Sequence, residues 1–183
     1  MNAGASVSSD EQLRLFLALR VPAEVLGEIE RWQLAQLPDV RLVPREYLHI
    51  TLVFLGQRPA GELDAIVGAL REAVVEAGEI RLTPVRYRET RSVGMLVLED
   101  EGGRAAVLAS DVQQRLEALG VYRSEARPWL PHLTVARWRD RPRLRPELPA
   151  VGTFVPSDAA AYLSRLHPAG ARYEVLESVA LGG

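Results

Sequence analysis

The chain has 183 residues, 22 of them basic and 24 acidic, so its formal net charge at pH 7 is −2. This length suits one compact domain, and this charge excludes a polycation that coats nucleic acid over its whole surface. The chain contains no cysteine, and all of its cationic side chains other than histidine are arginines. Disulfides, thiol nucleophiles and mechanisms that need a lysine, such as a lysyl-nucleotide intermediate, are therefore excluded.

The hydrophobic pattern along the chain predicts strands and helices separated by turn residues. Alternation with β-branched and aromatic residues marks the strands, and apolar residues at three- and four-residue spacing mark the helices. In chain order, we expect a loose tail at 1–10, a strand at 12–20, a helix at 22–37, strands at 40–43 and 48–55, a helix at 61–77, strands at 79–88 and 93–99, a helix at 104–119, and strands at 130–138, 159–166 and 172–181.

The order of these elements predicts an α+β fold with two lobes, each an antiparallel sheet with helices outside, around a central cleft. No long linker interrupts the chain, so residues 11–183 are expected to form a single bilobal domain. No apolar run approaches the roughly 18 residues that a membrane helix needs, and the apolar stretch at 13–21 follows an acidic pair instead of a basic leader. We therefore expect a soluble, cytoplasmic protein, monomeric by default.

Two of the three histidines occur in the same local context. Random placement of three histidines and five threonines in this chain gives roughly 0.08 His-x-Thr triplets, so two are unexpected. In a strand, residues i and i+2 point to the same face, so each histidine and its threonine should project together while their apolar neighbours pack on the other side. The two motifs are His49-Ile50-Thr51-Leu52 and His132-Leu133-Thr134-Val135.

Two such pairs facing one cleft suit the transfer of a phosphate ester. One imidazole can act as general base and the other as general acid, because both titrate near neutrality. The hydroxyls of Thr51 and Thr134 can hold phosphoryl oxygens, on which charge accumulates during the reaction. This design needs no metal and no other cofactor.

Two other interpretations of the histidines are less favoured. A lone histidine at a strand end most often only satisfies hydrogen bonds, but the repetition of the motif argues for a function. A metal site is disfavoured because the two histidines have no carboxylate or cysteine nearby in the sequence at a common ligand spacing.

The two motifs resemble the signatures of the 2H phosphoesterases, specifically the RNA 2′,3′-cyclic phosphodiesterases historically called 2′-5′ RNA ligases. The resemblance covers about residues 12–181, and it implies the fold of that family, bilobal with two antiparallel sheets and outer helices. It is carried by His49–Gly56 and Pro131–Arg137, by Arg14–Leu19, which is similar to the family's first strand, and by Leu163–Leu166 with Gly170–Leu176, which are similar to its closing hairpin.

The resemblance implies hydrolysis of a terminal 2′,3′-cyclic phosphate on RNA, or on a nucleotide, to a 2′-phosphate. It implies that His49 protonates the departing 3′-oxygen, that His132 activates water, and that Thr51 and Thr134 hold the phosphoryl oxygens. Two alternatives stay open. The reverse reaction would join RNA ends through a 2′-5′ linkage without ATP, and a protein that lost catalysis would be a module that only binds RNA ends.

Four further residues near the motifs are candidates for substrate binding. Arg127 stands five residues before the second histidine, where members of the family often carry arginine, and its guanidinium could clamp phosphate. Trp129 and Tyr47 flank the motifs and could stack on a terminal base, although packing in the core or at the rim is as good an interpretation. Phe16 is expected to form the floor of the pocket or, more simply, part of the core.

The segment 137–145 carries five arginines at every second position, opposed by one aspartate. It could guide an RNA backbone, but a solvated loop interrupted by prolines is the preferred interpretation, because arginine is the only cation this chain uses apart from histidine. His167 lies in an expected turn and is predicted to be a surface residue.

Overall fold

The computed structural model describes residues 10–181 and confirms the expected α+β fold with two antiparallel sheets and outer helices. Most of the expected tail, residues 1–9, lies outside the described residues. Within them the elements are β1 (Gln12–Arg20), α1 (Ala23–Gln36), β2 (Arg41–Leu42), β3 (His49–Pro59), α2 (Leu63–Ala77), β4 (Leu82–Glu89), β5 (Val93–Asp100), α3 (Arg104–Ala118), β6 (His132–Arg137), β7 (Asp158–Arg165) and β8 (Arg172–Ala180).

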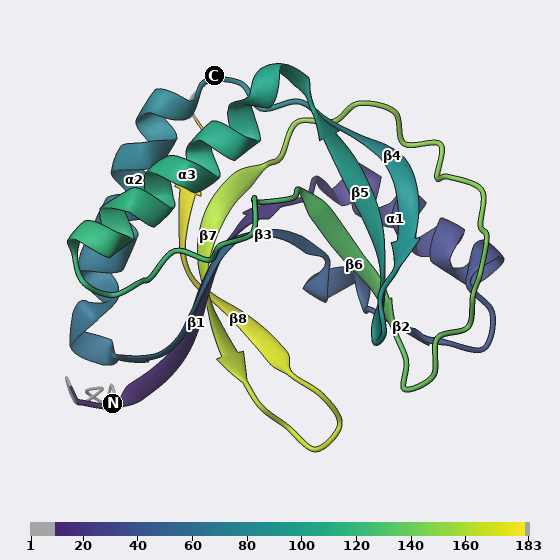
Figure 1. Cartoon of the computed structure of the whole chain (residues 1–183), viewed down its shortest axis with the longest axis horizontal. Coiled ribbons are helices and arrows are strands. Elements are labelled where there is room, and N and C mark those ends of the chain that lie inside the picture. The colour runs from purple at the N-terminus through teal and green to yellow at the C-terminus, as the bar shows by residue number, and fades with distance from the viewer. Residues whose placement is uncertain (1–9, 182–183) are drawn as a thin grey trace, which may run out of the picture.

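Each sheet draws strands from distant parts of the chain (Figure 1). Sheet A has the order β3-β1-β7-β8, and sheet B has the order β2-β6-β5-β4. The first and last strands of the chain thus share sheet A, while β2 from the first quarter joins sheet B. The lobes are therefore not successive halves of the sequence, although the order of the elements alone would suggest it.

The helices lie on the outer sides of the two sheets (Figure 1). Helices α2 and α3 lie side by side next to sheet A (Figure 1). Helix α1 is tied to sheet B by the buried Gln33, whose amide donates to the carbonyl oxygens of Val43 and Val135 at 3.0 and 2.7 Å. None of the helices among residues 10–181 is long and apolar enough to cross a bilayer.

The side chains of β1 divide between two environments because a strand alternates its faces. Leu15, Leu17 and Leu19 are buried in the main core. Phe16 and Ala18 point the other way and pack in a second, smaller cluster with residues of β7. This second cluster forms the base of the cleft, so the fold places aromatic rings directly under the site.

Strand β3 does not stop at Gly56, the residue that follows the predicted strand 48–55, but continues to Pro59. Gly56 adopts a positive φ of 69°, and the register with β1 shifts there, pairing Leu15 with Gly56 and Phe16 with Phe54. The glycine therefore forms a bulge inside the strand instead of ending it. As a result Phe54 is paired with Phe16 and lines the cleft.

Candidate active site

The two His-x-Thr motifs open strands that face each other across the cleft. His49 is the first residue of β3 in sheet A, and His132 is the first residue of β6 in sheet B. The apolar residues after each histidine and threonine are at most 1% exposed, as the strand alternation predicts. The four polar side chains all line one cavity of about 710 Å³.

Both imidazoles are held by the same local hydrogen bond. The Nδ1 atom of His49 lies 2.8 Å from the carbonyl oxygen of Tyr47, and that of His132 lies 2.8 Å from the carbonyl oxygen of Leu130. A carbonyl can only accept, so Nδ1 carries the hydrogen in both rings. The Nε2 atoms, which have no hydrogen-bond partner among residues 10–181, are left to exchange protons with a ligand in the cleft.

His49 is surrounded by aromatic rings. Its imidazole centroid lies 4.8 Å from the ring of Phe16, 5.8 Å from Tyr162 and 5.4 Å from Tyr173. Burial among these rings, with smaller contributions from the positive charges of His132 and Arg137, lowers the pKa of His49 to about 4. His49 is therefore neutral near pH 7 when the cleft holds no anion.

The cleft is strongly positive although the chain as a whole is slightly acidic. Within the described residues no carboxylate lines it, whereas four arginines do. Such a cavity attracts anions, because it concentrates the electric field of the positive charges that line it. These arginines are Arg14, Arg41, Arg137 and Arg172.

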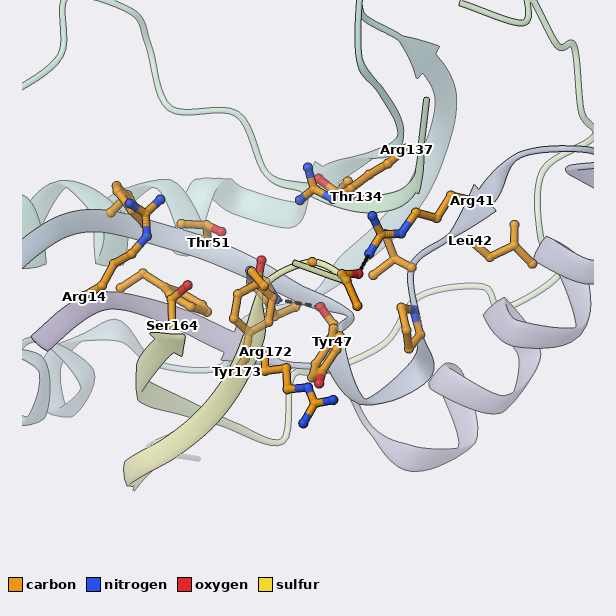
Figure 2. Close-up of a pocket in the computed structure, with 18 of the residues that line it drawn as sticks. Arg14, Arg41, Leu42, Tyr47, Thr51, Thr134, Arg137, Ser164, Arg172 and Tyr173 are labelled. Carbon is orange, nitrogen blue, oxygen red and sulfur yellow. Dashed lines mark hydrogen bonds between the residues drawn. The ribbon is translucent and has the colours of Figure 1, made fainter. Parts of the chain in front are cut away.

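The arginines lie at different places along the cleft (Figure 2). Arg137, the last residue of β6, lies beside Thr134, so a guanidinium and a hydroxyl approach the same part of the cavity. Arg14 lies at the end near Ser164, with its guanidinium 4.7 Å from the centroid of the Phe54 ring. Its Nε atom is buried without a hydrogen-bond partner among residues 10–181. An anionic ligand would supply that partner.

Arg41 connects the two lobes at the opposite end of the cleft. Its guanidinium donates to the carbonyl oxygen of Ala169 at the tip of the β7–β8 hairpin (Figure 2). Gly170 makes this contact possible, because a Cβ there would collide with the Nη2 of Arg41. Among residues 10–181 no three His, Asp or Glu side chains gather closely enough to hold a metal ion together.

The predicted binding residues divide between the cleft and the surface. Phe16 and Tyr47 line the cleft. Arg127 does not: its side chain is 87% exposed and pairs with Glu125 at 3.5 Å, because it lies in the irregular segment before β6.

Trp129 is also outside the cleft lining. Its indole N–H donates to the carbonyl oxygen of Thr51 at 2.9 Å. That bond ties the segment before the second motif to the strand of the first. His167 is exposed, as predicted.

Sequence reasoning missed three of the four cleft arginines, namely Arg14, Arg41 and Arg172. Arg14 could have been found, because it stands two residues before Phe16 on the same strand face. Arg41 and Arg172 enter the cleft only through the pairing of distant strands. A chain without lysine offers 22 arginines, so composition alone does not single them out.

Comparison with known proteins finds relatives that are similar to nearly the whole chain. Residues 21–171 match the 2′-5′ RNA ligase superfamily. An RNA 2′,3′-cyclic phosphodiesterase from Thermus thermophilus is 35% identical over 93% of this chain and 91% of its own length, and one from Methanocaldococcus jannaschii is 25% identical over 90% and 99%. The solved structure of Escherichia coli LigT in complex with NADP+ superposes with a TM-score of 0.80 at 26% identity, covering 94% of this chain and 99% of that one.

Proposed function

The chain belongs to the 2′-5′ RNA ligase superfamily as one of its phosphodiesterases, and we propose that it is a metal-independent RNA 2′,3′-cyclic phosphodiesterase. Water attacks the phosphorus of a terminal 2′,3′-cyclic phosphate, the bond from phosphorus to the 3′-oxygen breaks, and a 2′-phosphate remains beside a free 3′-hydroxyl. The observation that carries the proposal is the matched pair of histidines, which present two Nε2 atoms to one arginine-lined cleft.

The phosphate binds between the two motifs. The hydroxyls of Thr51 and Thr134 donate to its non-bridging oxygens, and Arg137 supplies a full positive charge beside Thr134. The transition state carries more charge on these oxygens than the ground state does. Donors fixed by β3 and β6 therefore stabilise the transition state without having to reorganise.

The two histidines divide the proton transfers. His132 takes a proton from the attacking water, and His49 gives a proton to the departing 3′-oxygen. The fixed Nδ1–H bonds leave Nε2 as the exchanging atom in both rings. One proton leaves water and one arrives on the 3′-oxygen, so the protein returns to its net protonation state after each turnover.

His49 takes up its proton together with the substrate. Its pKa of about 4 in the unliganded protein makes it neutral, partly because of the positive charges of His132 and Arg137. The bound phosphodiester carries a negative charge that opposes both contributions and raises the pKa. An NMR titration of the His49 Cε1–H signal should therefore show a higher pKa with an inert phosphodiester bound than without it. An unchanged pKa would argue against His49 as the acid.

The direct test of this function is end-group analysis of RNA with a 2′,3′-cyclic phosphate, incubated with the protein and a metal chelator. We expect a 2′-phosphate as the product and an undiminished rate in chelator. A 3′-phosphate product would overturn the direction of ring opening, and activity abolished by chelator would overturn the metal-independent mechanism. RNA binding without turnover would indicate that the protein is a module that only recognises RNA ends.

A further inference from the structure

The segment after β6 and the end of β4 form a second concave site, about 550 Å³ in volume. Figure 1 shows this segment passing around the outer side of sheet B. We infer that four arginines of this site, which we name the arginine track, bind the backbone of the RNA on the 5′ side of the reacting end. The track consists of Arg88, Arg141, Arg143 and Arg145.

A buried carboxylate holds the track in place. The side chain of Glu89 is only 3% exposed, and it accepts hydrogen bonds from the backbone N–H of Arg143 at 3.0 Å and of Leu144 at 2.7 Å. It also pairs with the Nε of Arg141 at 3.0 Å. Arg143 is held at a positive φ of 59°, a conformation that few non-glycine residues adopt. The loop is therefore a built structure and not a freely solvated run of charges.

Three of the four charges are available to a ligand. Within the described residues, Arg88, Arg143 and Arg145 have no carboxylate within 4.0 Å, whereas Glu89 neutralises only Arg141. Arg141, Arg143 and Arg145 are exposed, and the residues between them are half-buried.

The register of sheet B connects one member of the track, Arg88, to the cleft. Thr134 pairs with Met95, and Met95 pairs with Arg88, so all three side chains lie on the same face of the sheet. Two strand spacings separate the Cα atoms of Thr134 and Arg88 by about 10 Å. Along the chain, Arg137 in the cleft and Arg141 in the track are at most about 14 Å apart. Arg88 thus lies on the cleft side of the edge strand β4, while its neighbour Glu89 points to the other face and holds the rest of the track at that edge.

A single-stranded polyanion fits this arrangement. A cyclic phosphate occupies the 3′ end of an RNA, so every other nucleotide of the substrate lies on its 5′ side and must leave the cleft. This inference rests on the proposed function for the identity of that end. It specifies the substrate as an oligonucleotide, because a mononucleotide carries no phosphate that could reach the track.

The test compares two substrates and two double variants. The substrates are a decanucleotide ending in a 2′,3′-cyclic phosphate and a nucleoside 2′,3′-cyclic monophosphate. The variant Arg143→Gln/Arg145→Gln removes two track charges. The control, Arg71→Gln/Arg104→Gln, removes two exposed arginines from α2 and α3 that have no ion pair among the described residues.

We expect the track variant to raise KM for the decanucleotide about tenfold. For the mononucleotide, KM and kcat should both stay unchanged. The slope of log KM against log salt should fall by about 1.4, as expected for two lost single-strand phosphate contacts. Arg88→Gln should give part of the same effect, and the control variant none. A decanucleotide KM and salt slope equal to those of the control would overturn the inference.

Binding measurements separate this inference from the proposed function. Fluorescence anisotropy with a decanucleotide ending in an inert phosphate needs no turnover. If the wild type hydrolyses neither substrate but binds this RNA more tightly than the track variant does, the proposed function fails and the track stands. Equal affinities of wild type and track variant would overturn the track, whatever the catalytic result.

Discussion

His49 and His132 open strands of different sheets, and each donates its Nδ1–H to the carbonyl two residues before it. Their surroundings differ. Aromatic rings enclose His49, whereas in the described part of the chain no aromatic ring packs against His132. A repeated motif therefore fixes the tautomer and the direction of each ring, and the aromatic surroundings lower the pKa of His49 through burial. Local sequence sets the direction of a ring, whereas the neighbouring strands set its environment.

The largest expected effect comes from removing either Nε2 atom. His49→Asn and His132→Asn each keep a side-chain donor for the same backbone carbonyl but lose the proton-exchanging nitrogen. We expect each to lower kcat on cyclic-phosphate RNA about a thousandfold, with the fold intact by circular dichroism. The control His167→Asn, in an exposed turn, should leave kcat unchanged. If either site variant kept the rate of the wild type, the assignment of that histidine would be wrong.

The depressed pKa of His49 should also appear in stability. An unfolded histidine titrates near 6.5 and the folded one near 4, so the unfolded chain binds the additional proton first as the pH falls. The stability that His49 contributes by staying neutral in the folded protein is fully present above pH 6.5 and is lost by about pH 4. We expect chemical denaturation to show that the wild type loses about 2–3 kcal/mol more than His49→Asn over this range.

His132→Asn serves as the control for that measurement, since it leaves the aromatic surroundings of His49 in place. It should lose nearly as much stability as the wild type between pH 6.5 and pH 4. An identical pH dependence for the wild type and His49→Asn would contradict burial as the cause of the depressed pKa.

The threonines should matter less than the histidines, and about equally in both motifs. Thr51→Val and Thr134→Val keep the shape of the side chain but remove a donor to a charged oxygen, which should lower kcat about 10–100-fold. Thr83→Val, at an exposed pair of threonines away from the cleft, is the matched control. A loss in only one of the two motif variants would show that a single lobe holds the phosphate.

The smallest effect is expected where the two lobes touch. Gly170→Ala would displace the Arg41 guanidinium and break its bond to Ala169, raising KM about two- to fivefold with kcat unchanged. Gly102→Ala is a good control, because Gly102 also has a positive φ but a Cβ there meets no atom within 4 Å. Both variants should lose about 1 kcal/mol of stability. Only Gly170→Ala should change KM in steady-state assays.

Much of the fold could be predicted from the sequence because alternation and helical spacing are local properties. The strand beginning at the second histidine and the helix ended by Gly78 lie close to their expected positions. Gly56 was misleading, since a glycine ends a strand or forms a bulge according to its partner strand. The division of strands between the sheets is likewise decided by pairing at long range, which periodicity does not encode.

The arrangement of the candidate site was predictable in part. The repeated motif predicts that the two histidines and two threonines face one cavity, as they do, because their spacing sets their direction on a strand. The exposed position of Arg127 and the bond from Trp129 to Thr51 depend on the course of an irregular segment. The pKa of His49 depends on rings contributed by β1, β7 and β8. Each of these is a tertiary property.

The division of labour between the two histidines can be tested most directly with an RNA end in which sulfur replaces the 3′-oxygen of the cyclic phosphate. A thiolate leaves without a proton, so this substrate does not need the general acid. We predict that His49→Asn hydrolyses it at a rate within about tenfold of the wild type, while His132→Asn stays as slow as on the oxygen substrate. Rescue of His132→Asn instead, with His49→Asn still slow, would contradict the account and reverse the two roles.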